Sequence, residues 1–80
     1  MLKQYNINLV KVLRLAREMI ILADEGDEHR MDKTCGVLYG ILRDSAYKIR
    51  TLAEKEKILH IDSGIWESDA EIEINDLMNK

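Results

Sequence analysis

Two histidines stand among acidic residues and are the side chains best suited to bind a metal ion. His29 lies in the run DEGDEHRMD, and His60 follows Glu56 by four residues and precedes Asp62 by two. Metal sites need several ligands at defined spacings, and these runs contain neither paired Cys and His sets nor the alternating oxygen ligands of a calcium loop. We therefore predict solvated charge at both histidines, and no metal or cofactor. A site completed by a second subunit stays open.

Ser45 and Cys35 are the candidate nucleophiles, and the sequence supports neither. Ser45 has no histidine in helical phase with it, and the chain has no glycine-rich phosphate loop after a strand. Cys35 falls on an apolar series, where a lone cysteine behaves as a small hydrophobic residue; a reactive thiolate near a helix N-terminus is the alternative. One cysteine excludes an intrachain disulfide and fits a reducing compartment. We predict that the protein is not an enzyme.

Two glycines, Gly36 and Gly40, stand four residues apart in the run CGVLYGILRDSAYKIR. Each costs a helix about 1 kcal/mol relative to alanine, so their presence needs a reason. Glycines at this spacing let a second backbone approach closely, and Arg43 and Tyr47 frame the same side of the helix. We call these four residues the glycine flank. The hypothesis is that it receives a partner helix or a small anionic ligand; the alternatives are packing against the neighbouring helix and simple exposure.

The composition is that of a small helical protein. Of the 80 residues, 46% are hydrophobic, 34% are charged and 5% are aromatic, and there is no proline. This profile favours helices over sheets. The net charge of −3 is uneven, because residues 1–60 carry eleven Lys and Arg against nine Asp and Glu, whereas residues 61–80 carry one against six. Without a concentrated basic patch, nucleic acid is not the expected partner.

The sequence contains no evident membrane or secretion segment. Its longest uninterrupted apolar run, MIILA, is far too short to span a bilayer. The N-terminal residues mix lysine with polar side chains and lack the apolar region of a signal peptide. We expect a cytoplasmic protein with no membrane contact, from a bacterial or archaeal source.

The segment NLVKVLRLAREMIILADEG predicts a long amphipathic helix. Its apolar residues fall in an arc of about half the helix circumference. They are Leu9, Val12, Leu13, Leu15, Ala16, Met19, Ile20, Leu22 and Ala23. Asn6 or Asn8 is expected to cap the start of this helix, and Gly26 is expected to end it.

A second apolar series keeps helical phase from Met31 to Ala53 and predicts a second helix. This helix is expected to start at about Asp27 or, in the alternative, at Asp32, and to run to about His60. Because the connection is short, the two helices should be antiparallel neighbours.

The second predicted helix is longer than the first and is expected to overhang it. At 1.5 Å per residue the lengths are about 27 Å and about 42 to 50 Å. With Glu25 beside Asp27, Leu9 would lie near Arg43, and the apolar residues beyond that level would be uncovered. Those assigned to an interaction surface are Ile49, Leu52 and Leu59. Either the C-terminal segment or a second copy of the hairpin could cover them. We favour the copy, because both helices are apolar over half their circumference or more.

The acidic C-terminal segment, residues 62–80, is expected to be distinct from the hairpin of residues 1–61. Gly64 should end the second helix, and a short third helix anchored by Trp66 could fold back. The alternation of isoleucines at positions 72 and 74 leaves a strand or disorder open.

These features predict an all-α protein, an antiparallel helical hairpin that dimerises into a four-helix bundle. The expected function is that of a non-catalytic protein–protein interaction or adaptor module acting as a homodimer. One alternative is a small nucleic-acid-binding regulator. Another is a ligand or metal sensor that uses the glycine flank or the histidines.

Overall fold

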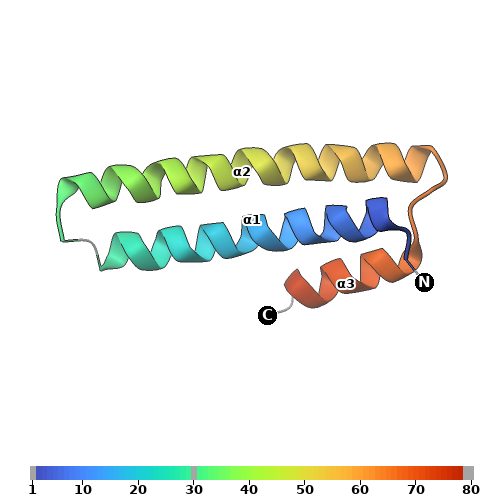
Figure 1. Cartoon of the computed structure of the whole chain (residues 1–80), viewed down its shortest axis with the longest axis horizontal. Coiled ribbons are helices and arrows are strands. Elements are labelled where there is room, and N and C mark those ends of the chain that lie inside the picture. Colours follow the sequence, from blue (N-terminus) through green and yellow to red (C-terminus); the bar gives the residue numbers. More distant parts are fainter. Residues whose placement is uncertain (1, 30, 79–80) are drawn as a thin grey trace.

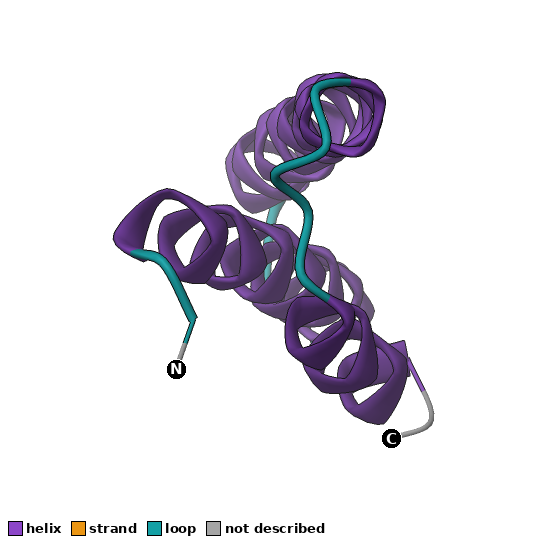
Figure 2. Cartoon of the chain, turned by 90° about the vertical axis from the view of Figure 1, so that its right-hand side faces the viewer, coloured by secondary structure: helices purple, strands orange, loops and turns teal. Residues whose placement is uncertain are grey.

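A computed structural model of the chain describes residues 2–29 and 31–78, with side chains up to residue 75. The described chain forms three helices, α1 (Gln4–Glu28), α2 (Lys33–Asp62) and α3 (Ser68–Met78). Figure 1 shows α1 and α2 lying antiparallel along most of their length, with α3 returning beside α1. Seen from the end, α1 lies between α2 and α3 (Figure 2). The predicted all-α class and the helical hairpin are confirmed.

The contact between α1 and α2 is built largely from small side chains. Ala16 and Ala23 of α1 and Ala46 of α2 have no exposed surface, and Ala53 of α2 is buried as well. Small residues let two helices approach closely, but each buries only one methyl group. The seam is therefore close, and it contributes little apolar burial per residue.

The first helix begins earlier than the sequence predicted. It starts at Gln4, so Asn6 lies inside the helix, where its side chain is completely buried. Asn8 is also helical, and its side-chain oxygen accepts a hydrogen bond from Gln4 at 2.8 Å. The prediction that Asn6 or Asn8 caps this helix is wrong, because the chain before them already has helical backbone geometry.

Gly26 does not end the first helix, contrary to the prediction. The helix continues to Glu28, and the aromatic ring of Tyr39 in α2 packs directly against Gly26. A Cβ at position 26 would collide with that ring. Gly26 therefore serves close approach between helices rather than helix termination, since only glycine leaves room for the ring.

The second helix starts at the later of the two predicted positions. Asp32 is its N-cap, and the Asp32 carboxylate accepts a hydrogen bond from the Cys35 backbone N–H at 2.8 Å. That hydrogen bond stabilises the ionised carboxylate and lowers the pKa of Asp32. The alternative start at Asp27 is wrong, because Asp27 still belongs to α1.

The predicted overhang of the second helix is absent, because α1 is longer and the turn lies later than expected. Asp24 of α1 pairs with Arg43 of α2 at 2.9 Å, and Asn6 meets His60 at 2.8 Å. Leu9 therefore lies far along α2 from Arg43, and the predicted register is wrong. The helix α1 accompanies α2 almost to its C-terminal end (Figure 1).

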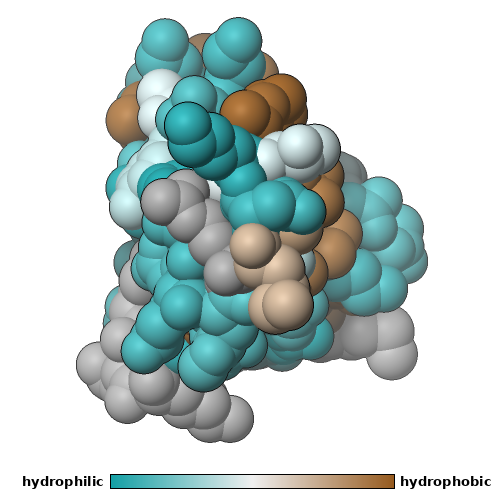
Figure 3. Space-filling model, turned by 90° about the vertical axis from the view of Figure 1, so that its left-hand side faces the viewer, coloured by the Kyte–Doolittle hydropathy of each residue, from teal (hydrophilic) through white to brown (hydrophobic). Residues whose placement is uncertain are grey.

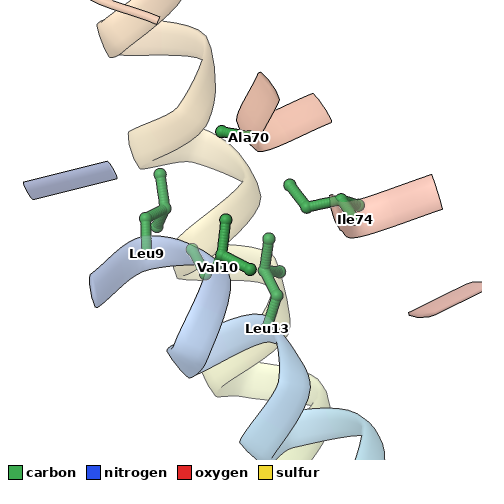
Figure 4. Packing of buried hydrophobic residues seen from close by; sticks show 6 residues of the cluster. Leu9, Val10, Leu13, Ala70 and Ile74 are labelled. Atoms are coloured by element: carbon green, nitrogen blue, oxygen red, sulfur yellow. The ribbon is translucent and has the colours of Figure 1, made fainter. Parts of the chain in front are cut away.

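The C-terminal segment is helical and packs on α1. Gly64 has a φ of 76°, the left-handed conformation that ends α2 as predicted. Figure 4 shows Val10 and Leu13 of α1 pointing toward Ala70 and Ile74 of α3. The full cluster contains Leu9, Val10, Leu13, Ala53, Ala70 and Ile74, with Leu2 and Trp66 packed against it. A helical tail, one of the three states left open, is therefore the observed one.

Candidate interaction surface

The glycine flank lies on α2, on the side from which α3 packs but at the opposite end of the hairpin. Among the described residues, nothing lies within 4 Å of the position that a Cβ of Gly40 would take. Gly36 is half-buried. Gly40 therefore borders open space and does not pack against α1.

The side chains that frame the glycine flank are already engaged within the chain. The Arg43 guanidinium donates to one Asp24 oxygen through Nε at 3.1 Å and Nη2 at 2.9 Å. Tyr47 is exposed, and the Arg50 guanidinium lies 4.8 Å from its ring centre. Because Asp24 neutralises Arg43, the flank offers little to an anionic ligand. A helix contact at this flank stays a prediction.

The three other predicted contact residues, Ile49, Leu52 and Leu59, belong to a different face of α2. They belong to a strip of residues that recur along α2 at spacings of three, four or seven and therefore share one face of the helix. This strip consists of Leu38, Ile41, Ser45, Ile49, Leu52 and Leu59. The exposed fraction of its four exposed residues lies between 56% for Leu59 and 61% for Ile41. We call it the α2 strip.

The α2 strip faces away from α3. Lys57 of α2 forms an ion pair with Glu71 of α3 at 2.6 Å. On the surface of α2, Lys57 lies to one side of the buried alanines. At 100° per residue, Ser45 lies on the other side of those alanines. The α2 strip is therefore the side of the hairpin that α3 leaves uncovered.

Apolar residues of α1 continue the uncovered surface. Met19 lies on the opposite side of α1 from Val10, which packs toward α3. The α1 residues on this side are Val12, Leu15, Met19 and Leu22, of which Met19 is half-buried and the others are exposed. Together with the α2 strip they form what we call the open flank. Viewed from the turn end, hydrophobic side chains gather on the right-hand side of the molecule, below α2 (Figure 3).

A shallow hollow of about 360 Å³ lies at the centre of the α2 strip. It is lined by Ile41, Asp44, Ser45, Lys48 and Ile49. All five residues come from one helix, so the hollow has no opposing wall and does not enclose a ligand as a small-molecule pocket does. Its shape suits the side chains of another helix.

A second hollow of about 200 Å³ lies between α1 and α2. It is lined by Leu13, Arg17, Ile20, Ile21 and Arg50. Its walls are apolar and two guanidinium groups border it. It faces the side on which α3 packs and is separate from the open flank.

A buried polar cluster joins α1, the end of α2 and the following linker. The Asn6 side-chain NH₂ donates to the Ile65 carbonyl at 2.8 Å, which leaves the Asn6 side-chain oxygen to accept from His60 Nδ1 at 2.8 Å. The proton on neutral His60 is therefore at Nδ1. His60 Nε2 lies 3.6 Å from a Glu56 oxygen, and the Tyr5 ring stands edge-on at 5.5 Å between ring centres.

Sequence reasoning missed this cluster by assigning Asn6 to a helix cap. A signal was present, because Asn6 precedes Leu9 and Val10 by three and four residues and so shares the buried side of α1. His60, considered as a metal ligand, is instead part of this hydrogen-bonded cluster. Within residues 2–29 and 31–78, no group of three or more His, Cys, Asp or Glu is placed to hold a metal ion.

The remaining sequence candidates are separate from one another. His29 is exposed at the end of α1, and Cys35 is half-buried in the first turn of α2. Ser45 lies in the middle of the α2 strip. In the described part of the chain, no helix has the length and apolar character needed to cross a membrane.

No family model, curated protein or solved structure matches the chain.

Proposed function

We propose that the protein is a non-catalytic interaction module that acts as a homodimer, with the open flank as the contact between subunits. The observation that carries this proposal is the continuous exposure of large apolar residues on both helices of that flank. Leu15 and Leu22 of α1 and Leu38 and Leu52 of α2 are each more than half exposed. Contiguous apolar patches of this kind on a small protein typically mark a binding surface.

The small core gives a thermodynamic reason for association. Five of the nine buried hydrophobic residues in the described chain are alanines. At about 0.8 kcal/mol per buried CH₂ group, alanines add far less stability than leucines would. Chains of this size commonly need a source of stability besides their own hydrophobic core, such as association with a second subunit. Packing two open flanks together would bury the exposed leucines and produce a four-helix bundle.

The adaptor role follows from what such a dimer would leave exposed. In this arrangement the glycine flank and α3 lie away from the subunit contact, where another protein has access to them. Helix α3 carries Asp69 and Glu73, both of which are exposed. A partner with a basic surface is the complementary choice for this acidic helix.

The two other functions considered receive less support. Two cations of the hairpin, Arg43 and Lys57, are paired with acids, and acidic residues interleave with the other cations along the sequence, so a concentrated basic surface for nucleic acid is not favoured. For a ligand or metal sensor, Arg43 and His60 are both committed to partners within the chain.

The test is the solution mass of the chain and of two matched variants, by light scattering across a dilution series. Leu52 and Ile58 are on the same helix and are 59% and 55% exposed, but only Leu52 lies on the open flank. The wild-type protein and Ile58→Asp should have twice the mass of one chain, 9.3 kDa, at micromolar concentration. Leu52→Asp should be monomeric. A monomeric wild-type protein, or equal dimerisation of both variants, contradicts the proposal.

A further inference from the structure

We propose that two copies pair through the α2 strip, with the α2 helices antiparallel and the two-fold axis at Ser45. This inference rests on the proposed homodimer and adds its orientation and register. In a two-fold contact the same surface of each subunit meets itself, so the surface must be self-complementary about the axis. The α2 strip meets this requirement in the spacing of its apolar residues, in the small side chain at its centre and in the charges along its edge.

The apolar residues of the α2 strip are distributed symmetrically about Ser45. Ile41 and Ile49 stand four residues before and after it, and Leu38 and Leu52 stand seven before and after. In an antiparallel pair centred there, Ile41 meets Ile49 of the second copy and Leu38 meets Leu52 of the second copy. Spacings of four and seven are those of a helix–helix seam, so these side chains alternate along one contact line.

The same symmetry extends to the ends of α2. Met31 lies fourteen residues before Ser45 and is 92% exposed, and Leu59 lies fourteen residues after it. Glu56, an acid within the face of the α2 strip, comes level with Thr34 in the first turn of α2 of the second copy. A carboxylate is favoured beside a helix N-terminus. Met31 precedes the N-cap Asp32, so it comes level with Leu59 of the second copy but lies outside the helix. The register gives Glu56 a favourable neighbour.

Charges beside the seam favour the antiparallel orientation. Asp44 and Lys48 are exposed and lie on the outer edge of the α2 strip, away from α1. In the antiparallel register Asp44 of each copy lies beside Lys48 of the other, which gives two attractive contacts. A parallel two-fold pairing would place the two outer edges on opposite sides of the seam, so neither of these attractive contacts would form. Ser45, a small residue, lies where the helices approach most closely.

The α1 residues of the open flank are consistent with the same two-fold axis. The contacts of Asp24 with Arg43 and of Asn6 with His60 place Ala46, one residue from the axis, at the level of Ile20 and Ile21. Met19 and Leu22 stand on either side of that level. The same two-fold axis therefore brings Met19 of one copy to Leu22 of the other, and both helices of the flank share one symmetry.

The first test mixes two charge variants, Asp44→Lys and Lys48→Asp. Each variant alone places like charges across the seam, and we expect its homodimer to be weaker by about tenfold. Mixing the two should restore the affinity of the wild-type dimer, measured by sedimentation equilibrium. Asp44 and Lys48 are also an i, i+4 pair within one helix, but both variants lose that pair and mixing does not restore it. Recovery on mixing therefore reports a contact between copies.

The second test is a disulfide at the axis. In a Cys35→Ser background, Ser45→Cys should form a disulfide-linked dimer under mild oxidation, because a disulfide forms only where the two Cα atoms approach within about 7 Å. Glu54→Cys in the same background is the control, since Glu54 is exposed on the opposite side of α2 and should stay reduced.

The outcomes separate this register from the homodimer itself. A wild-type protein that is monomeric overturns both proposals. A dimer whose Ser45→Cys variant stays reduced, or whose charge variants gain nothing on mixing, overturns the register and leaves the homodimer standing. That result would point to pairing of α2 with α1 of the second copy.

Discussion

At the scale of single residues, two glycines in helices have opposite environments. Gly26 packs against the ring of Tyr39, whereas Gly40 borders open space. The sequence drew attention to Gly40 and assigned Gly26 to a helix end. Local propensity is the same at both positions, so only the neighbouring helix distinguishes them.

This difference predicts opposite effects of alanine at the two sites. Gly40→Ala should raise the free energy of unfolding by up to about 1 kcal/mol, because alanine favours the helix and its Cβ meets no neighbour. Gly26→Ala should lower it by about 1 to 2 kcal/mol, because displacing the ring outweighs the gain in propensity. Urea unfolding followed by circular dichroism measures both. Equal stabilisation by the two substitutions would contradict the role of Gly26.

Asn6 and Asn8 provide a second matched pair at this scale. Asn6→Ala should lower the free energy of unfolding by about 1 to 3 kcal/mol, since it leaves His60 and the Ile65 carbonyl without their buried partner. Asn8→Ala should change stability by less than about 0.5 kcal/mol, because the hydrogen bond of Asn8 with Gln4 is exposed. Thermal unfolding compares them. A larger loss at Asn8 would show that the capping interpretation was the better one.

At the scale of the helices, the sequence predicted their existence but not the register of the hairpin. Helical periodicity and the acid at Asp32 are local signals, and they identified both long helices and gave Asp32 as one of two possible starts of α2. Gly26 lies inside α1, and the ring against which it packs, Tyr39, belongs to another helix. The acidic run around Gly26 does not indicate that contact. The turn was therefore predicted too early in the chain, and the predicted overhang, which does not exist, followed from that error.

The packing of α3 on α1 is a second property of the helices that can be tested. Ile74 is 6% exposed and packs on α1, whereas Ile72 is 58% exposed. Trp66, the single tryptophan, donates to Glu71 at 3.2 Å and lies under Lys57. Ile74→Asp should release α3 and shift Trp66 fluorescence to the red, because burying a carboxylate in the cluster is unfavourable. Ile72→Asp should leave the emission unchanged.

The circular dichroism of the Ile74→Asp variant serves as the control for the hairpin. Helix α3 spans 11 residues, against 25 in α1 and 30 in α2, so most of the helical signal should remain. Unshifted emission in Ile74→Asp would mean that the cluster does not hold the tail. Loss of the whole signal would mean that the hairpin depends on α3.

At the scale of the whole molecule, the chain is elongated, with extents of 48 × 21 × 17 Å. One side of the hairpin is covered by α3 and the other is the open flank. The contact residues predicted from the sequence divide between these sides: Ile49, Leu52 and Leu59 lie on the open flank, and the glycine flank does not. Leu52 and Leu59 are exposed, as predicted, whereas Ile49 is half-buried. The predicted reason for their exposure, the overhang, was wrong.

The polar cluster of Asn6, His60 and Ile65 has a consequence for the order in which the chain folds. Its contacts join residues 54 and 59 positions apart, whereas Asp24 and Arg43 are 19 apart. Shorter loops close at a lower entropic cost, so we expect the turn end of the hairpin to form first and pairing to proceed toward the ends of the helices. During synthesis, Asn6 emerges well before His60 and Ile65 exist. The first turn of α1 can therefore obtain its buried polar partners only after His60 and Ile65 have been made.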